Sequence, residues 1–196
     1  MRDPLDRYYT SPELAVACLQ RLVSRAQVQP AIVYDAHCGR REWLSAARLV
    51  MPKVEVAGAD LDPGVTETPR DWLQDAERVG SEFARRDWWL VGNPPYSSWQ
   101  EHFIAAMRLK AEAKPSLIAW VLRLDALASF ASLERVFARQ VPDHVDVLVP
   151  RPSFIGRKSG QYDYALVTWM PQRVRLFSKS ELYWFQWRSR RRPKRR

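Results

Sequence analysis

The chain has 196 residues, of which 46% are hydrophobic and 27% are charged, and its formal net charge is +9. This size and composition predict one globular domain with a sizeable core. No apolar run approaches a membrane span and no secretory signal pattern opens the chain, so we expect a cytoplasmic protein. Two cysteines, Cys18 and Cys38, are too few for a disulfide framework and should be free thiols. No histidine stands at a metal-ligand spacing from them, so no metal is predicted.

The positive charge is concentrated at the carboxyl end of the sequence. Seven of the nine residues at 188–196 are Lys or Arg, and removing them from the net charge of +9 leaves +2. Such a run is typical of a tail that contacts a polyphosphate backbone, although it can also be a solvated end that aids solubility. We therefore predict one domain over residues 1–187, a basic and disordered tail over 188–196, and a nucleic acid as partner.

Hydrophobic patterning predicts helices that alternate with short apolar strands. The first helix begins at Ser11, a capping residue that precedes Pro12, Glu13 and apolar residues at helical spacing. Residues 64–86 are polar and only weakly patterned. The alternation indicates an α/β fold with a mostly parallel sheet, helices on both faces and an antiparallel pair of late strands at one edge. The predicted helices span 11–27, 42–50, 99–113 and 126–140, and the predicted strands span 31–34, 54–59, 88–91, 117–122, 145–149 and 164–170.

The most informative motif follows the predicted strand at 88–91. Asn93-Pro94-Pro95-Tyr96 must form a turn, because two prolines can neither continue a strand nor enter a helix interior. The turn gathers an amide, backbone carbonyls and an aromatic ring at the carboxyl end of a strand, where open α/β sheets bind ligands. These groups offer acceptors for an exocyclic amine and a flat surface for a heterocycle. A Pro-Pro turn with Tyr96 as a packing residue is the alternative interpretation.

Two further strand ends carry groups suited to an adenosine cofactor. Asp35 and Gly39 follow the strand at 31–34, and an acid, a glycine turn and a helix in this order are typical of nucleotide-type sites. Asp60 follows the strand at 54–59, where a carboxylate can accept hydrogen bonds from both ribose hydroxyls. Either acid could also be an ordinary turn residue.

In their order along the chain, these segments resemble the Asn-Pro-Pro-Tyr amino-methyltransferases, and most closely the small phage- or prophage-type DNA adenine-N6 methyltransferases. The resemblance runs from Tyr8 to about Met170 and includes the segments at 8–12, 151–154 and 164–169. It implies a Rossmann-like class I methyltransferase fold with a seven-stranded sheet and an antiparallel edge hairpin. It also implies S-adenosyl-L-methionine as cofactor and DNA methylation, as in restriction-modification, as the activity.

The resemblance implies which parts of the chain hold the cofactor. The tyrosine-threonine segment would cap its methionine end, Asp60 (or Asp62) would bind the ribose, and an acid followed by a tryptophan would contact the adenine. The family has a second glycine after Gly39, where this chain has Arg41, and this departure is expected to narrow or reshape the pocket. The implied cofactor-binding residues are Tyr9, Thr10, Asp35, Gly39, Asp60, Asp71, Trp72 and Asn93.

The implied reaction is methyl transfer to the exocyclic N6 of adenine in DNA. Asn93 and the carbonyl of Pro94 would accept the two amino hydrogens, and Tyr96 would stack on a base flipped out of the duplex. Phe154 would form the other wall of the base pocket, and neighbouring basic residues would hold phosphates. The implied catalytic residues are Asn93, Pro94, Pro95 and Tyr96, and the implied nucleic-acid contacts are Tyr96, Arg151, Phe154, Arg157 and Lys158.

Two other functions stay open. The same tetrapeptide occurs in methyltransferases that act on adenine in RNA or on protein glutamine, and single-stranded DNA is a further substrate. A nucleic-acid-binding protein that has lost its cofactor is the other function; Arg41 favours it and the intact motif at 93–96 opposes it. Because only residues 171–187 separate the last predicted strand from the tail, a DNA-acting enzyme should have a short or loose sequence preference.

Overall fold

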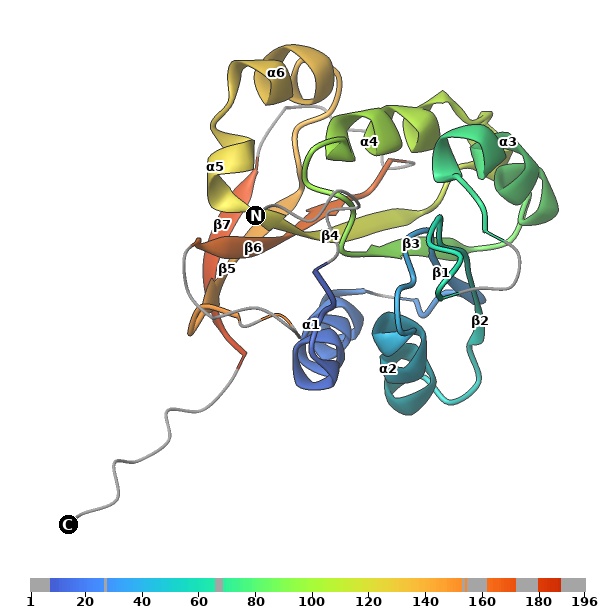
Figure 1. Ribbon diagram of the computed structural model, residues 1–196, viewed down its shortest axis with the longest axis horizontal. Coiled ribbons are helices and arrows are strands. Elements are labelled where there is room, and N and C mark those ends of the chain that lie inside the picture. The colour runs from blue at the N-terminus through green and yellow to red at the C-terminus, as the bar shows by residue number, and fades with distance from the viewer. Residues whose placement is uncertain are drawn as a thin grey trace.

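The chain folds into a single seven-stranded sheet with helices on both faces, as the computed structural model shows (Figure 1). The structure describes residues 8–26, 28–65, 69–152, 154, 162–171 and 180–187, and the tail at 188–196 lies outside these ranges. No helix in these ranges is both long enough and apolar enough to cross a membrane. The strands are β1 (Ile32–Asp35), β2 (Glu55–Gly58), β3 (Trp88–Gly92), β4 (Leu117–Arg123), β5 (His144–Val149), β6 (Tyr164–Trp169) and β7 (Glu181–Gln186).

The sheet has the strand order β2-β1-β3-β4-β6-β5-β7 and is mostly parallel. Among these seven strands only β6 runs antiparallel to its neighbours, β4 and β5, which confirms the predicted antiparallel hairpin. The strand order reverses between β1 and β3, where Asp35 pairs with Val91. Such a reversal leaves a crevice beyond the carboxyl ends of the two strands, which is where ligands bind in open α/β sheets.

The helices form a layer on each side of the sheet. α1 and α2 cover one face, and α3, α4, α5 and α6 cover the other (Figure 1). Alternate side chains of β3 enter the two cores: Trp88 and Leu90 pack with α3 and α4, whereas Trp89 and Val91 pack with α1 and α2. The helices are α1 (Pro12–Arg25), α2 (Glu42–Val50), α3 (Trp72–Glu82), α4 (Trp99–Arg108), α5 (Leu124–Leu127) and α6 (Phe130–Ser132).

The weakly patterned segment at 64–86 contains α3. Asp71 caps this helix, and its side chain accepts a hydrogen bond from the backbone N–H of Leu73 at 2.9 Å. The buried face includes an alanine and a glycine, which contribute little to a hydrophobic pattern. The buried residues nevertheless recur at helical spacing, so the helix is amphipathic, but its low overall hydrophobicity makes the pattern hard to see in the sequence. The buried residues are Trp72, Ala76, Val79 and Gly80.

The helix predicted over 99–113 is shorter in the structure. α4 ends at Arg108, and a separate 3-10 turn covers Ala111–Ala113. The chain turns here to bury Leu109 against Gly80, where a Cβ would lie 2.9 Å from the Leu109 side chain. A longer straight helix would leave this apolar side chain outside the core.

The single helix predicted over 126–140 is wrong. The structure divides this segment into α5, α6 and a π-helical turn at Leu133–Phe137. Ser129 accounts for the break, because its hydroxyl donates to the carbonyl of Ala126 and also accepts from the backbone N–H of Ser132. Such side-chain bonds satisfy backbone groups that a continuous helix would pair internally.

The seventh strand, β7, lies in the segment at 171–187, where no strand was predicted. It pairs in parallel with β5 and extends the sheet beyond the hairpin. Asp146 on β5 is fully buried and accepts hydrogen bonds from Arg21 at 3.1 Å and Arg25 at 2.8 Å, both on α1. The guanidinium of Arg25 lies 4.5 Å from the ring centroid of Tyr183 on β7. Ion pairing and cation–π contact thus join α1, β5 and β7.

Candidate active site

Asn93 follows β3 directly and lies at the crevice between β1 and β3. Its side-chain Nδ2 donates to the backbone carbonyl of Tyr8 at 2.5 Å, and since that carbonyl can only accept, the contact fixes the orientation of the amide. Its Oδ1 is buried and accepts no hydrogen bond from any residue that the structure describes. An unsatisfied buried acceptor costs free energy, so binding of a ligand whose N–H donates a hydrogen bond to this oxygen would be favoured.

Asp35 ends β1 and packs against the end of β3. Its side chain is fully buried, and its Oδ1 accepts from the backbone N–H of His37 at 3.0 Å. A Cβ at Gly92 would lie 2.5 Å from this oxygen, so glycine is needed immediately before Asn93. Burial raises the pKa of the Asp35 carboxyl to about 8, and the His37 N–H only partly opposes the shift. A cationic ligand group in the crevice would favour ionisation of this carboxyl.

The Asp35 carboxyl should make stability depend on pH. Its pKa rises from 3.8 to about 8 on folding, so the folded chain binds more protons than the unfolded chain between these values. The free energy of unfolding should therefore fall as pH rises through this window, by at most about 1.4 kcal/mol per pH unit. Urea denaturation of the wild type and of Asp35→Asn at several pH values tests this. The variant should show a shallower dependence, and equal slopes for the two proteins would contradict the assignment.

The N-terminal segment lies over the glycine turn. Gly39 has φ +48°, and a Cβ at this position would lie 2.8 Å from the ring of Tyr9. Thr10 is buried, and its Oγ1 accepts from the indole N–H of Trp43 on α2 at 3.2 Å. The structure therefore brings Tyr9 and Thr10 to the turn, and uses the Thr10 hydroxyl to hold the segment against α2.

A pocket of about 430 Å³ opens beside this turn. Of the two acids after β2, Asp62 lines the pocket, whereas Asp60 accepts from the backbone N–H groups of Gly39 and Asp62, each at 2.8 Å. Asp60 thus holds the glycine turn in place, and Asp62 is the acid that the structure places at the pocket. The lining residues are Tyr9, Gly39, Arg40, Arg41, Asp62, Gly64 and Val65.

Asp71 and Trp72 have structural roles at the start of α3. Trp72 is buried, its ring centroid lies 5.9 Å from that of Tyr34, and its indole N–H donates to the carbonyl of His102 at 3.0 Å. Asp71 caps the helix. Contact of this pair with a cofactor adenine stays a prediction.

Two histidines that the sequence did not single out stack beside the crevice. The ring centroids of His37 and His102 are 4.5 Å apart. Burial lowers the pKa of both, for His102 to about 4, so both rings are neutral at neutral pH. Both ring nitrogens of His37 and the Oδ2 of Asp35 are buried without partners in the described part of the chain. With Asn93 Oδ1, they form a set of polar atoms that a bound polar ligand would satisfy.

The signals for these two histidines differ. His37 lies in the glycine turn after β1, so its position in the motif was available from the sequence. His102 comes from α4, and only packing of that helix over the sheet brings it to His37.

Four aromatic rings gather next to Asn93. Tyr96 and Phe154, the predicted walls of a base pocket, both contact Tyr8 and Tyr164. The ring centroid of Tyr8 lies 5.3 Å from that of Tyr96 and 6.2 Å from that of Phe154. The ring centroid of Tyr164 lies 5.9 Å from that of Tyr96 and 4.9 Å from that of Phe154. The structure therefore brings the two predicted walls into one cluster, and adds Tyr8 and Tyr164 between them.

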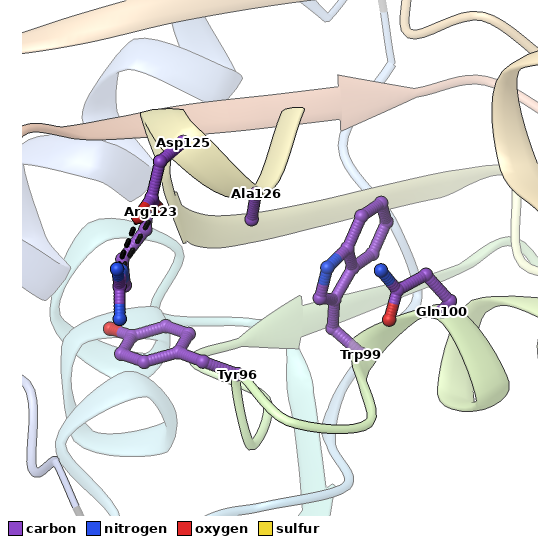
Figure 2. A pocket seen from close by; sticks show the side chains of 6 residues that line it. All are labelled: Tyr96, Trp99, Gln100, Arg123, Asp125 and Ala126. Atoms are coloured by element: carbon purple, nitrogen blue, oxygen red, sulfur yellow. Dashed lines mark hydrogen bonds and ion pairs between the residues drawn. The ribbon is translucent and has the colours of Figure 1, made fainter. Parts of the chain in front are cut away.

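A second pocket, of about 210 Å³, lies beside Tyr96 (Figure 2). Figure 2 shows the Arg123–Asp125 ion pair near the phenol end of Tyr96, with Trp99 and Gln100 farther along the hollow. An aromatic ring, an amide and a charged pair at one hollow are suited to a polar heterocycle. The lining residues are Tyr96, Trp99, Gln100, Arg123, Asp125 and Ala126.

The predicted phosphate contacts lie on the segment between β5 and β6. Arg151 forms an exposed ion pair with Asp163, with 2.5 Å between Nε and Oδ1. A phosphate would therefore have to compete with this carboxylate. Arg157 and Lys158 lie outside the residues that the structure describes.

Comparison with known proteins identifies the fold. No protein-family model and no curated protein sequence matches the chain. A putative class I S-adenosylmethionine-dependent methyltransferase from Listeria monocytogenes is similar in structure, with 14% identity, a TM-score of 0.54, and coverage of 92% of this chain and 66% of that one. A modification subunit of a putative type I restriction enzyme from Vibrio vulnificus has 15% identity and a TM-score of 0.54, over 85% and 45% of the two chains.

TrmN from Thermus thermophilus is also similar, with 20% identity, a TM-score of 0.51, and coverage of 80% of this chain and 48% of that one. The chain thus spans about half the length of the Vibrio and Thermus proteins. These likenesses, with the sheet order and the antiparallel hairpin, show that the chain has the Rossmann-like class I methyltransferase fold.

Proposed function

We propose that this protein transfers a methyl group from S-adenosylmethionine to the exocyclic N6 of adenine in DNA. The observation that carries the proposal is the Oδ1 of Asn93, a buried acceptor with no donor among the described residues, held in orientation by the Tyr8 carbonyl and adjacent to aromatic rings. The similar Listeria methyltransferase and Vibrio restriction-enzyme modification subunit support a methyltransferase.

The residues present fit S-adenosylmethionine, whose amine and sulfonium are cationic and whose adenosine carries hydrogen-bond donors. Asp35 Oδ2 and the His37 ring nitrogens are buried atoms that lack partners in the described ranges. The pocket of about 430 Å³ at Tyr9, Gly39 and Asp62 is of the size that small-molecule sites have. These residues would hold the cofactor, which when bound supplies an electrophilic methyl group.

Asn93 and Pro94 would prepare the methyl acceptor. An amino group on a purine ring is a poor nucleophile because its lone pair is delocalised into the ring. If Asn93 Oδ1 and the Pro94 carbonyl accept its two hydrogens, the nitrogen becomes more tetrahedral and the lone pair is localised on it. When the new N–C bond has formed, one hydrogen leaves the nitrogen as a proton to water. Catalysis here rests on positioning and electrostatics.

The aromatic surroundings favour a nucleobase over a glutamine side chain as acceptor. Tyr96 and Tyr8 are partly exposed and offer flat surfaces that a heterocycle can stack on, with the buried rings of Tyr164 and Phe154 packed against them. The 210 Å³ pocket beside Tyr96 adds hydrogen-bonding groups for a base edge. An aliphatic amide would leave most of this surface unused. The seven basic residues at 188–196 favour a polyphosphate partner.

The test is methyl transfer from labelled S-adenosylmethionine to a panel of acceptors. The panel contains unmethylated duplex DNA, single-stranded DNA, RNA and a glutamine-containing peptide, and the product is digested and identified as a nucleoside or an amino acid. We expect N6-methyladenine in DNA, formed about 100- to 1000-fold more slowly with Asn93→Ala.

The alternatives have separate outcomes. N6-methyladenine in RNA alone, or methylglutamine, would overturn the DNA assignment and keep the methyltransferase. Binding of DNA with neither methyl transfer nor cofactor binding would instead favour a nucleic-acid-binding protein that retains only the fold.

A further inference from the structure

Arg41 occupies an unusual backbone position at the start of α2. It has φ +69° and ψ +25°, a left-handed conformation that glycine adopts readily and other residues rarely adopt. The resemblance predicts a glycine here, so the chain keeps the glycine-like backbone and adds a long cationic side chain. The backbone N–H of Arg41 donates to the Cys38 carbonyl at 2.6 Å, which closes the turn. Strained positions that persist in this way often lie at ligand sites.

The pocket of about 430 Å³ is where this side chain lies. Arg40 and Arg41 both line it, and Asp62 is the one acid among the lining residues that the structure describes. Arg40 is held over the ring of Tyr9, with its guanidinium carbon 4.9 Å from the ring centroid. Burial raises the pKa of the Glu42 carboxyl at the start of α2, and the nearby charge of Arg40 partly opposes this shift; Glu42 is not among the described lining residues.

The two guanidinium groups are available to a ligand. Neither guanidinium forms a hydrogen bond or an ion pair with a residue in the described ranges. The guanidinium of Arg40 makes the cation–π contact with Tyr9. The amino-terminal end of α2 begins at the same point, and the partial positive charge of a helix amino terminus also favours a negative charge, although the Glu42 carboxylate already accepts from backbone N–H groups there. Two arginines, a helix end and a pocket of ligand size therefore converge on an anionic group.

We propose that Arg40 and Arg41 bind the carboxylate of the methionine moiety of S-adenosylmethionine and so select cofactors that carry this group. Tyr9, in the same lining, belongs to the segment expected at the methionine end of the cofactor, which places the carboxylate rather than the adenine at the arginines. A guanidinium can bind a carboxylate through two parallel hydrogen bonds. A glycine at this position would let the cofactor approach the backbone closely, and Arg41 would instead contact the cofactor through its side chain. The inference rests on the proposed cofactor, and it does not depend on the methyl acceptor.

The test compares S-adenosylmethionine with decarboxylated S-adenosylmethionine, which differ only in this carboxylate. Isothermal titration calorimetry on the full chain should give at least about tenfold tighter binding of S-adenosylmethionine by the wild type. In Arg40→Gln/Arg41→Gln the ratio of the two affinities should fall close to one. Arg41→Gly should lower the ratio without lowering the melting temperature, because glycine accepts φ +69° without strain.

Three results would overturn the inference. One is an unchanged affinity ratio in the double variant. Another is tighter binding of S-adenosylmethionine by Arg41→Gly, which would show that the arginine obstructs the pocket. If the wild type binds neither ligand, the cofactor assignment fails, and this inference fails with it.

Arg41→Lys keeps the positive charge and loses the planar guanidinium. It should retain part of the selectivity for S-adenosylmethionine, which separates the effect of charge from that of geometry.

Discussion

Replacing Asn93 with alanine should lower the rate of methyl transfer by about 100- to 1000-fold, the usual cost of removing one positioned transition-state hydrogen bond. The oxygen that is lost is the buried Oδ1, which has no partner among the described residues and is thus available to the acceptor amine. The rate should be measured in single turnovers with enzyme in excess, so that product release does not mask the chemical step.

Asn93→Asp is the matched comparison for this variant. It keeps an acceptor oxygen but loses the N–H that donates to the Tyr8 carbonyl at 2.5 Å, so an intermediate rate is expected. Both variants lose the hydrogen bond to the Tyr8 carbonyl, so their melting temperatures should fall, and each rate is measured well below the melting temperature of that variant. If Asn93→Ala kept more than about a tenth of the wild-type rate, Asn93 would not be the group that activates the amine.

Replacing Asp146 with alanine should destabilise the folded chain by about 3–5 kcal/mol, because two partly buried cations on α1 would lose their shared counter-ion. Asp146 is fully buried, and the side chains of Arg21 and Arg25 are 29% and 15% exposed. Urea denaturation gives the free energy of unfolding directly. The variant should also loosen β7, whose Tyr183 ring packs on the same two guanidinium groups.

Asp163→Ala is the control for this comparison. It removes the partner of Arg151, but both side chains of that pair are about half exposed, at 53% and 51%. Exposed ion pairs contribute about 0–1 kcal/mol, so this variant should unfold close to the wild type. If both variants lost a similar free energy of unfolding, burial of Asp146 would not be the reason for the strength of its ion pairs with Arg21 and Arg25.

Much of the fold follows from local patterns in the sequence. Apolar runs between turn residues locate six strands, and α1 and α2 follow from helical spacing and capping. The rule that ligands bind beyond the carboxyl ends of parallel strands also brings together the motif at 93–96 and Asp35. The structure agrees, since Asp35 packs against Gly92, next to Asn93. These features are predictable because each depends on a few adjacent residues.

Other features depend on contacts between distant segments. β7 pairs with β5, and Tyr183 on β7 packs on arginines of α1, so its place depends on contacts that no local pattern shows. The stacking of His37 on His102 has the same origin, since it requires α4 to pack over the sheet. The roles of single residues within the candidate site were also beyond local reasoning: Asp60 holds the turn while Asp62 reaches the pocket.

The order of motifs along the chain is thus enough to predict the class of fold and to place Asn93, Asp35 and Gly39 at the same edge of the sheet. The contacts of each side chain could not be predicted, because they depend on burial and on long-range contacts that the sequence does not show. Arg41 is an example of both the predictable and the unpredictable features. Its identity marks a departure from a glycine pattern, but its left-handed backbone and its place in a pocket beside Arg40 come from the folded turn.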